Sequence, residues 1–214
     1  MSSMKKNLVI IGAGGLAREV YDLANYCDPN HKELEVKGFL SDGPSAIEQM
    51  GYPPVLSTVS DYEIESGDVF ICAIGNVSDR KKTVEIIKSK GGEFVNLIHP
   101  TCVIAPSVSL GEGIAMKAFC VLASDIEIGD YVFFQSSVIM GHDVKIGDYT
   151  HINSFSFFAG YVTVAPQCVI NAGARLIQNV TIGEKAVVGM GSVVLKNVAP
   201  KTTVFGAPAK RVNY

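Results

Sequence analysis

The chain has 214 residues, of which 48% are hydrophobic and 18% charged, proportions typical of a folded globular protein with one or two domains. Its formal net charge of −3 excludes the basic footprint of most nucleic-acid-binding domains. No stretch reaches the roughly 18 apolar residues that cross a bilayer, and the five cysteines form no C-x-x-C pair, so we expect a cytoplasmic protein with free thiols, no membrane contact and no metal site.

The first part of the chain, residues 1–98, predicts a small α/β domain in which strands alternate with helices around a parallel sheet. A glycine-rich turn at Gly12–Gly15 separates the first strand from a helix with its apolar residues on one side. The segment 45–68 contains Pro53 and Pro54 and predicts no clear element. The expected strands cover 8–11, 36–40, 68–73 and 94–98, and the expected second helix covers 78–90.

The glycine turn has the spacing Gly12-x-Gly14-x-x-Ala17, which matches the dinucleotide fingerprint G-x-G-x-x-G/A between a strand and a helix. Glycines let the backbone approach a phosphate, and the helix N-terminus adds partial positive charge. A complete dinucleotide fold needs two mononucleotide halves, and this domain is long enough for little more than one. The turn therefore predicts a site for a single nucleotide or nucleotide-sugar. A turn that serves only helix packing, or a nicotinamide-dependent oxidoreductase, remains as an alternative.

Residues 99–214 follow a different pattern, because a bulky apolar residue recurs at every sixth position for sixteen consecutive hexads. These positions run from Ile104 to Val194, and the residue four places after each of them is small or β-branched. A fixed hexapeptide period predicts a parallel β-helix, in which each short strand buries its apolar face by stacking on the next coil.

Two histidines lie within the hexads, and the register predicts that both point away from the core. Met140 and Val144 take the inward positions around His142, and His151 is the last residue of the next hexad. Neither histidine is therefore expected to be needed for packing. Asp143 could orient the His142 imidazole, provided that the chain turns there.

Histidine titrates near pH 6.5 in the absence of neighbours, which makes it a suitable general base for an amine or hydroxyl nucleophile. The sequence contains no evident Ser/His/Asp set and no cluster of metal ligands. We therefore expect direct attack by a substrate group that His142 activates. A β-helix that serves only as a trimerising scaffold is the non-catalytic alternative, in which both histidines are dispensable.

Several segments, at both ends and in the middle of the chain, resemble the bacterial sugar O- and N-acetyltransferases. That family includes the sialic-acid O-acetyltransferase group and the enzymes that N-acetylate UDP- or dTDP-linked 4-amino-sugars. The resemblance covers essentially the whole chain. The matching segments are Gly12–Val20 (GAGGLAREV), Ala73–Asn76 (AIGN), Arg80–Lys82, Ser137–Asp143 (SVIMGHD), Gly147–His151 (GDYTH) and Gly206–Arg211 (GAPAKR).

The resemblance implies a Rossmann-like nucleotide-sugar-binding domain over residues 1–98 and a left-handed parallel β-helix with a C-terminal cap over 99–214. It also implies a homotrimer that binds acetyl-CoA between subunits and acts in bacterial polysaccharide biosynthesis. The expected reaction is acetyl transfer from acetyl-CoA to a nucleotide-linked amino-sugar, such as a UDP- or dTDP-4-amino-4,6-dideoxy-sugar. Acetylation of a sialic-acid or other sugar hydroxyl is the alternative.

Carried over from the family, His142 is the general base and Asp143 its orienting partner. His151 would meet the thioester end of acetyl-CoA, and the Gly160 N–H would stabilise charge on the thioester oxygen. The family often has histidine where this chain has Leu16, and some members have glutamate in place of Asp143, which leaves the sugar open. The remaining cofactor-binding residues would be Ala172, Gly173, Gly189 and Gly191. The nucleotide-sugar would bind to Gly14, Gly15, Asp42, Gly75 and Asn76.

The family's three hexads per coil separate His142 and His151, nine residues apart, by half a coil. The two side chains would then project from opposite sides of one subunit. A site that uses both must lie between subunits, so we expect an active site shared across a trimer interface.

Overall fold

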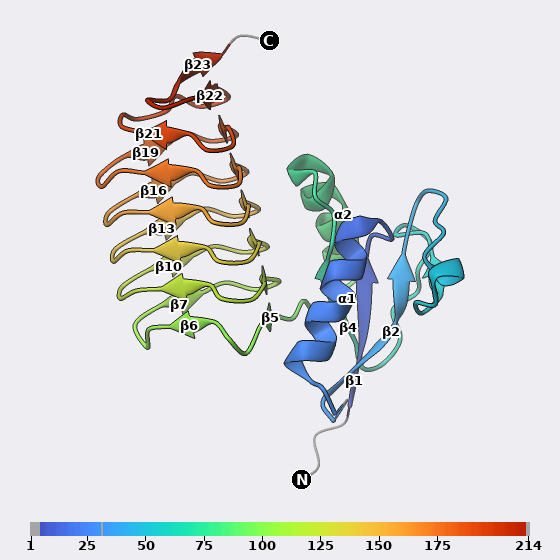
Figure 1. Cartoon of the computed structure of the whole chain (residues 1–214). Coiled ribbons are helices and arrows are strands. Elements are labelled where there is room, and N and C mark those ends of the chain that lie inside the picture. The colour runs from blue at the N-terminus through green and yellow to red at the C-terminus, as the bar shows by residue number, and fades with distance from the viewer. Residues whose placement is uncertain (1–4, 31, 213–214) are drawn as a thin grey trace. The chain divides into compact units, whose positions relative to one another are not determined.

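The computed structural model describes residues 5–30 and 32–212. The chain divides into two compact units, and the division falls between Leu97 and Ile98 (Figure 1). The first unit is an α/β domain and the second is a left-handed parallel β-helix, as the sequence predicts.

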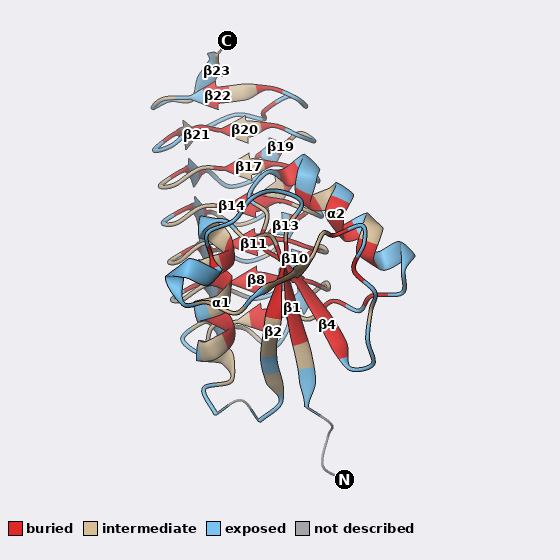
Figure 2. Cartoon of the chain, turned by 90° about the vertical axis from the view of Figure 1, so that its right-hand side faces the viewer, coloured by how far each residue is buried: buried red, intermediate tan, exposed pale blue. Residues whose placement is uncertain are grey.

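A four-stranded parallel sheet forms the centre of the first unit, with the strand order β3-β2-β1-β4. The strands β1 and β4 read as continuous apolar runs because both are buried over most of their length (Figure 2). The elements are β1 (Lys6–Ile11), α1 (Gly15–Cys27), β2 (Leu34–Leu40), the 3-10 helix η1 (Glu48–Met50), β3 (Val55–Ser57), β4 (Asp68–Cys72) and α2 (Val77–Ser89).

The strand order reverses direction at β1. From β1 the chain moves through α1 to β2 and β3 on one side, and then crosses to β4 on the other side of β1. Loops that leave neighbouring strands in opposite directions open a crevice at the carboxyl edge of a parallel sheet, where ligands of such folds bind. The loops after Ile11 and Cys72 lie at that edge.

The second unit is built from two-residue strands, and each strand pairs in parallel with the strand one coil later. Glu127 of one strand pairs with Lys145, eighteen residues further along, so three hexads make one coil. The coils stack into three sheets (Figure 1). The six-stranded sheet holds β6 (Val103–Ile104), β9 (Val121–Leu122), β12 (Ile139–Met140), β15 (Phe157–Phe158), β18 (Arg175–Leu176) and β21 (Val193–Val194). The five-stranded sheet holds β7 (Ser109–Leu110), β10 (Glu127–Ile128), β13 (Lys145–Ile146), β16 (Thr163–Val164) and β19 (Thr181–Ile182). The eight-stranded sheet holds β5 (Leu97–Ile98), β8 (Ala115–Met116), β11 (Phe133–Phe134), β14 (His151–Ile152), β17 (Val169–Ile170), β20 (Val187–Val188), β22 (Thr203–Phe205) and β23 (Lys210–Val212).

Each hexad gives one strand and one corner. The bulky residue is the second residue of the strand and points into the core, and the small residue fills the corner behind it. The residue before the small one takes a left-handed conformation, as at Asp143 (φ 58°) and Tyr161 (φ 61°). Its N–H donates to a carbonyl of the preceding coil, such as that from Tyr161 to His142 O at 3.0 Å. The hydrogen bonds of the corners therefore stack the coils in register.

The predicted strand 94–98 is wrong as one element, because its two ends pair with different sheets. Phe94 forms an isolated parallel bridge with Phe70 of β4, whereas Leu97–Ile98 is the first strand of the eight-stranded sheet. Ile98 stands six residues before Ile104 and packs against the β-helix core, so it already belongs to the hexad register.

The remaining differences from the sequence prediction are additions. The unassigned segment 45–68 contains η1 and β3. The last strand, β23, runs antiparallel to β22 and ends the eight-stranded sheet with a hairpin, in which Thr203 pairs with Val212. In the described ranges, no helix is both long and apolar enough to cross a bilayer.

Candidate active site

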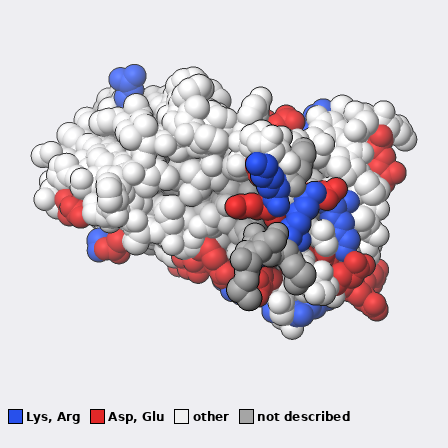
Figure 3. All heavy atoms as spheres, turned by 90° about the horizontal axis from the view of Figure 1, so that it is seen from below, with Lys and Arg blue, Asp and Glu red and all other residues white. Residues whose placement is uncertain are grey.

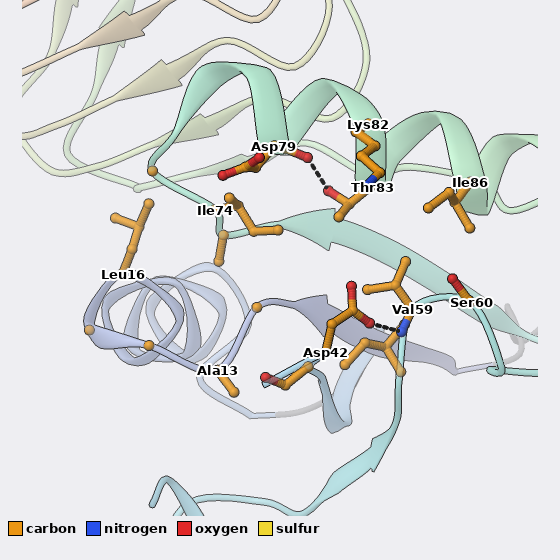
Figure 4. A pocket seen from close by; sticks show the side chains of 17 residues that line it. Ala13, Leu16, Asp42, Val59, Ser60, Ile74, Asp79, Lys82, Thr83 and Ile86 are labelled. Atoms are coloured by element: carbon orange, nitrogen blue, oxygen red, sulfur yellow. Dashed lines mark hydrogen bonds between the residues drawn. The ribbon is translucent and has the colours of Figure 1, made fainter. Parts of the chain in front are cut away.

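A cavity of about 530 Å³ opens at the carboxyl edge of the N-terminal sheet (Figure 4). Its walls come from the loops that follow β1, β2 and β4, from the segment Val59–Ser60, and from one face of α2. Four expected nucleotide-sugar residues line it, namely Gly14, Gly15, Asp42 and Gly75.

The glycines of the turn after β1 are needed for different reasons. Gly12 has φ +108°, and a Cβ there would lie 3.0 Å from the carbonyl oxygen of Ala73, so the protein's own packing requires glycine. A Cβ on Gly14 would meet nothing within 4 Å, and one on Gly15 would meet only the Arg18 guanidinium at 3.7 Å. No side chain caps the N-terminus of α1. The close approach of the loop after β4 thus accounts for Gly12, whereas Gly14 and Gly15 leave open backbone beside the cavity.

Asp42 stands just beyond the end of β2, and the neighbouring segment holds its carboxylate. Oδ1 accepts a hydrogen bond from the Val59 N–H at 2.8 Å (Figure 4), while Oδ2 has no protein partner in the described part of the chain. The Lys90 ammonium in turn donates to the carbonyl oxygens of Val59, Ser60 and Tyr62. Lys90 therefore holds in place the segment that bonds Asp42, and one oxygen of the Asp42 carboxylate is left for a ligand.

A buried network attaches the same segment to β2. The Lys37 ammonium lies 3.0 Å from Asp68 Oδ1, and the Tyr62 hydroxyl donates to Asp68 Oδ2 at 2.7 Å. Burial alone would raise the pKa of Asp68, but hydrogen bonds from Tyr62, the Glu65 N–H and Lys37 outweigh it and lower the pKa. Burial would likewise lower the pKa of Lys37, but its hydrogen bonds to the side chains of Tyr62, Glu65 and Asp68 raise it.

Two residues next to the cavity shape it without lining it, and one of them, Asn76, is an expected nucleotide-sugar ligand. Arg80 is 1% exposed, and its guanidinium donates to Ile74 O at 3.1 Å and Gly75 O at 3.5 Å, which fixes the loop after β4. Burial lowers the pKa of Arg80 to about 10, so it stays charged at neutral pH. Asn76 caps α2, where its Oδ1 accepts from the N–H groups of Ser78 and Asp79, and it is not among the residues that line the cavity.

The sequence prediction missed the face of α2 that the cavity uses. Asp79, Lys82, Thr83 and Ile86 line it, and Lys82 is the one lysine or arginine among the described lining residues. Their spacing of three and four residues was the available signal, because such residues share one helix face.

The second group of expected residues lies on the β-helix, at the corner between β12 and β13. Here His142 and Asp143 form the predicted turn, and His142 Nδ1 lies 2.8 Å from Asp143 Oδ2. A carboxylate can only accept a hydrogen bond, so in the neutral imidazole Nδ1 carries the proton and Nε2 presents its lone pair. The His142 side chain is 57% exposed, and Nε2 has no protein partner among the described residues.

Gly160 lies beneath the imidazole, one coil later. A Cβ on Gly160 would stand 2.8 Å from His142 Cε1 and 2.9 Å from Nε2, so any side chain here would displace the ring. The Gly160 N–H has no protein acceptor in the described part of the chain, whereas its carbonyl accepts from Asn179. A proton acceptor and a backbone donor therefore lie next to each other on an exposed corner.

His151 lies on a different face, as the register predicts, but it is not exposed. It sits in β14, beside Ile152 of the core, and is only 7% exposed. Its ring stacks on Phe133 at 5.1 Å, because paired strands bring the two side chains one above the other. His151 thus keeps the outward position that the register predicts, but it also makes a packing contact with Phe133 that the sequence did not reveal.

The four expected cofactor residues near the C-terminal end lie at the corner between the eight- and six-stranded sheets. Gly173 (φ +70°) and Gly191 (φ +66°) are successive left-handed corners, and the Gly191 N–H donates to Ala172 O at 2.8 Å. Together they form a corner without bulky side chains. Gly189 has a packing reason instead, because a Cβ there would lie 2.2 Å from the Phe205 ring.

The six-stranded sheet connects this corner to that of His142 and Gly160, and its outer face is apolar. A groove of about 680 Å³ runs over it, lined by Ile139, Phe157, Ile177, Val193 and Leu195 together with Arg175. Uncharged side chains also cover most of the lower end of the β-helix, the left part of Figure 3. Such a patch is typical of a surface that binds a ligand or a second protein.

Comparisons with known proteins agree with both units. Residues 7–87 match the family model of the PglD N-terminal domain. A structure of a histidine variant of perosamine N-acetyltransferase from Caulobacter crescentus, in complex with CoA and GDP-perosamine, is 30% identical with a TM-score of 0.86 and covers 97% of each chain.

Two further relatives name the same kind of reaction. The acetyltransferase domain of PglB from Neisseria gonorrhoeae, in complex with acetyl coenzyme A, is 26% identical with a TM-score of 0.87, over 97% of this chain and 100% of that one. UDP-N-acetylbacillosamine N-acetyltransferase from Bacillus subtilis is 28% identical over 116 residues, which span 53% of this chain and only 52% of that relative. The chain thus belongs to the bacterial sugar N-acetyltransferase family.

Proposed function

We propose that this protein transfers the acetyl group of acetyl-CoA to the amino group of a nucleotide-linked amino-sugar. The observation that carries the proposal is the His142 corner, where Asp143 holds Nδ1 and Gly160 leaves a free N–H beside the ring. The relatives' ligands, CoA and GDP-perosamine in one case and acetyl coenzyme A in another, support both substrates.

The geometry suggests how these residues act. Nε2 of His142 accepts the proton of the sugar amine as the nitrogen attacks the thioester carbonyl carbon. The Gly160 N–H donates to the carbonyl oxygen, on which negative charge grows. When the carbon–sulfur bond breaks, the imidazolium returns the proton to the departing thiolate, so that the products are an N-acetylated sugar and free CoA. Asp143 stabilises the imidazolium between these two steps.

The N-terminal cavity fits the nucleotide part of the acceptor. Gly14 and Gly15 offer open backbone at the start of α1, where a diphosphate is stabilised by N–H groups and by the helix dipole. Asp42 has one free carboxylate oxygen at the end of β2, the position from which an acidic side chain bonds a ribose hydroxyl in related sheets. Lys82 adds a positive charge to the same cavity. These features favour a nucleotide-sugar over a free sugar.

We further propose a homotrimer with its active sites between subunits. The apolar face of the six-stranded sheet is the surface such an assembly would cover, and it separates the His142 corner from the Gly173–Gly191 corner. A three-fold arrangement would let one subunit's His142 face a neighbour's cofactor corner. Acetyl-CoA and nucleotide-sugars are cytoplasmic metabolites, so we place the reaction, a step of bacterial glycan biosynthesis, in the cytoplasm.

The deciding experiment offers the purified protein acetyl-CoA with a panel of UDP-, dTDP- and GDP-linked amino-sugars and their hydroxyl counterparts. Mass spectrometry should detect acetylation of at least one amino-sugar, and turnover should be lost in His142→Ala. The corner one coil earlier gives a matched control, because Asp125 has the same left-handed conformation (φ 62°) as Asp143 but no histidine before it. Asp125→Ala should stay active. Transfer only to hydroxyl acceptors would make the protein an O-acetyltransferase, and a fully active His142→Ala would contradict the mechanism.

A further inference from the structure

Besides Asp143 and Gly160, a further residue in the described part of the chain contacts the His142 imidazole. The ring of Tyr161 lies edge to face with it, with the ring centroids 5.0 Å apart and an angle of 87° between the planes. The Tyr161 N–H also donates to His142 O at 3.0 Å, so the corner that carries Tyr161 is stacked on the corner that carries His142.

Tyr161 departs from the residue type that its position otherwise holds. Corners of successive coils at this edge carry Asp125, Asp143, Tyr161 and Asn179, all with φ between 58° and 63°. Asparagine and aspartate tolerate this left-handed conformation, whereas a bulky side chain there is strained. The tyrosine replaces the favourable residue type at the one coil that stacks on His142. Aromatic residues take the same left-handed position at other edges of the β-helix, as at Tyr131 and Tyr149, whose rings stack on each other. At this edge, the ring that Tyr161 contacts is that of His142.

We propose that Tyr161 is a positioning residue for His142, which holds the imidazole plane for proton transfer and stabilises the ring when it is charged. The inference rests on the proposed function and adds a residue to it. Asp143 holds the Nδ1 side of the ring, and Gly160 leaves room beneath it. Neither residue restricts rotation of the exposed ring out of its plane. The contact with the Tyr161 ring restricts that rotation.

The charged form of His142 is where the contact counts most. When Nε2 accepts the amine proton, the imidazole becomes a cation whose centroid lies 5.0 Å from that of the Tyr161 ring, inside the ~6 Å range at which an aromatic face attracts a cation. An attraction made only after proton transfer raises kcat and leaves substrate binding unchanged. The phenol hydroxyl has no part in this effect, so phenylalanine should replace tyrosine without loss.

The test compares two substitutions at Tyr161. Tyr161→Asn puts the residue type of Asn179 into a backbone that suits it, and should lower kcat about fivefold or more while both KM values stay unchanged. Tyr161→Phe should keep kcat within about twofold of the wild type. Tyr149→Asn is the matched control, because Tyr149 has φ 58° and its ring stacks on that of Tyr131 at 4.9 Å. It should leave kcat unchanged.

A second readout does not depend on turnover. The ring current of Tyr161 should shift the NMR signals of the His142 ring protons, and this shift should vanish in Tyr161→Asn and persist in Tyr161→Phe. An unchanged kcat in Tyr161→Asn, or a raised KM with unchanged kcat, would overturn the inference, as would a Tyr161→Phe variant as slow as Tyr161→Asn. An inactive wild type with an intact ring-current shift would instead count against the proposed function alone.

Discussion

Single residues at the His142 corner matter through the space that they leave as much as through the groups that they present. Asp143 determines which imidazole nitrogen carries the proton, and Gly160 allows the ring to lie where it does. Sequence reasoning suggested the role of Asp143 from its position next to His142, but it assigned the role of Gly160 only through resemblance to a family. No pattern of residues reveals that a glycine eighteen residues after His142 lies beneath its ring, because that contact follows from the pairing of coils.

Gly160→Ala should reduce kcat about a hundredfold, because its Cβ would stand within 3 Å of the ring and displace Nε2. The melting temperature should change little, since the ring can swing toward solvent from its exposed corner. The measurement is steady-state kinetics beside thermal unfolding. In a double-mutant cycle with His142→Ala, the two losses should not add, because both act through one imidazole. Additive losses would mean that Gly160 acts independently of His142.

Among the elements, the strands and helices around the glycine turn follow from the sequence, whereas the segment between β2 and β4 does not. Segment 45–68 has no period of two or of 3.6, and its conformation depends on long-range contacts such as those of Lys37 and Lys90. For the same reason Val59 and Ser60, which line the cavity, could not be predicted. The hexads, by contrast, were predictable throughout, because each residue's role repeats at a fixed interval. Only Leu97–Ile98 was misassigned, at the junction of the two patterns.

Lys37→Met should destabilise the N-terminal unit by about 2 kcal/mol or more at pH 7, because it leaves the carboxylate of Asp68 buried without its cation. Since the pKa of Asp68 is lowered by folding, its contribution to stability is present at neutral pH and is lost as the pH falls below the ordinary carboxyl range near 4. The difference between variant and wild type should therefore shrink between pH 5 and pH 3. Denaturant unfolding across that range measures it. A gap that stays constant with pH would show that Lys37 contributes by packing alone.

At the scale of the whole molecule, each subunit separates the residues that the reaction needs. His142 lies between the six- and five-stranded sheets, His151 lies in the eight-stranded sheet, and Gly173 and Gly191 lie at a third position. The three hexads per coil that the family resemblance implies predict the separation of the two histidines, but no count of residues in one chain gives the number of chains. The trimer stays a proposal that rests on the apolar face and on the need to bring these residues together.

Mixed assemblies provide the test. His142→Ala and His151→Ala subunits, each inactive alone, should recover about one quarter of wild-type activity when refolded together in equal amounts, because each interface then has one chance in four of pairing two intact residues. His151 also stacks on Phe133, so thermal unfolding must first establish that His151→Ala folds. Two inactive parents that give an inactive mixture would place both histidines in sites within one subunit.

The eighteen-residue coil also restricts how the length of this chain can change. Inserting one complete coil after Val194 would lengthen the β-helix. Every corner before the insertion would stay where it is, and every strand after it would stay in the same sheet. Inserting a single hexad between His142 and Gly173 would preserve the apolar period equally well, yet it would turn everything beyond it by one face and carry Gly173 and Gly191 to another edge. Among relatives, gaps of eighteen residues should therefore be compatible with activity, whereas gaps of six should be found only where no catalytic corner lies downstream.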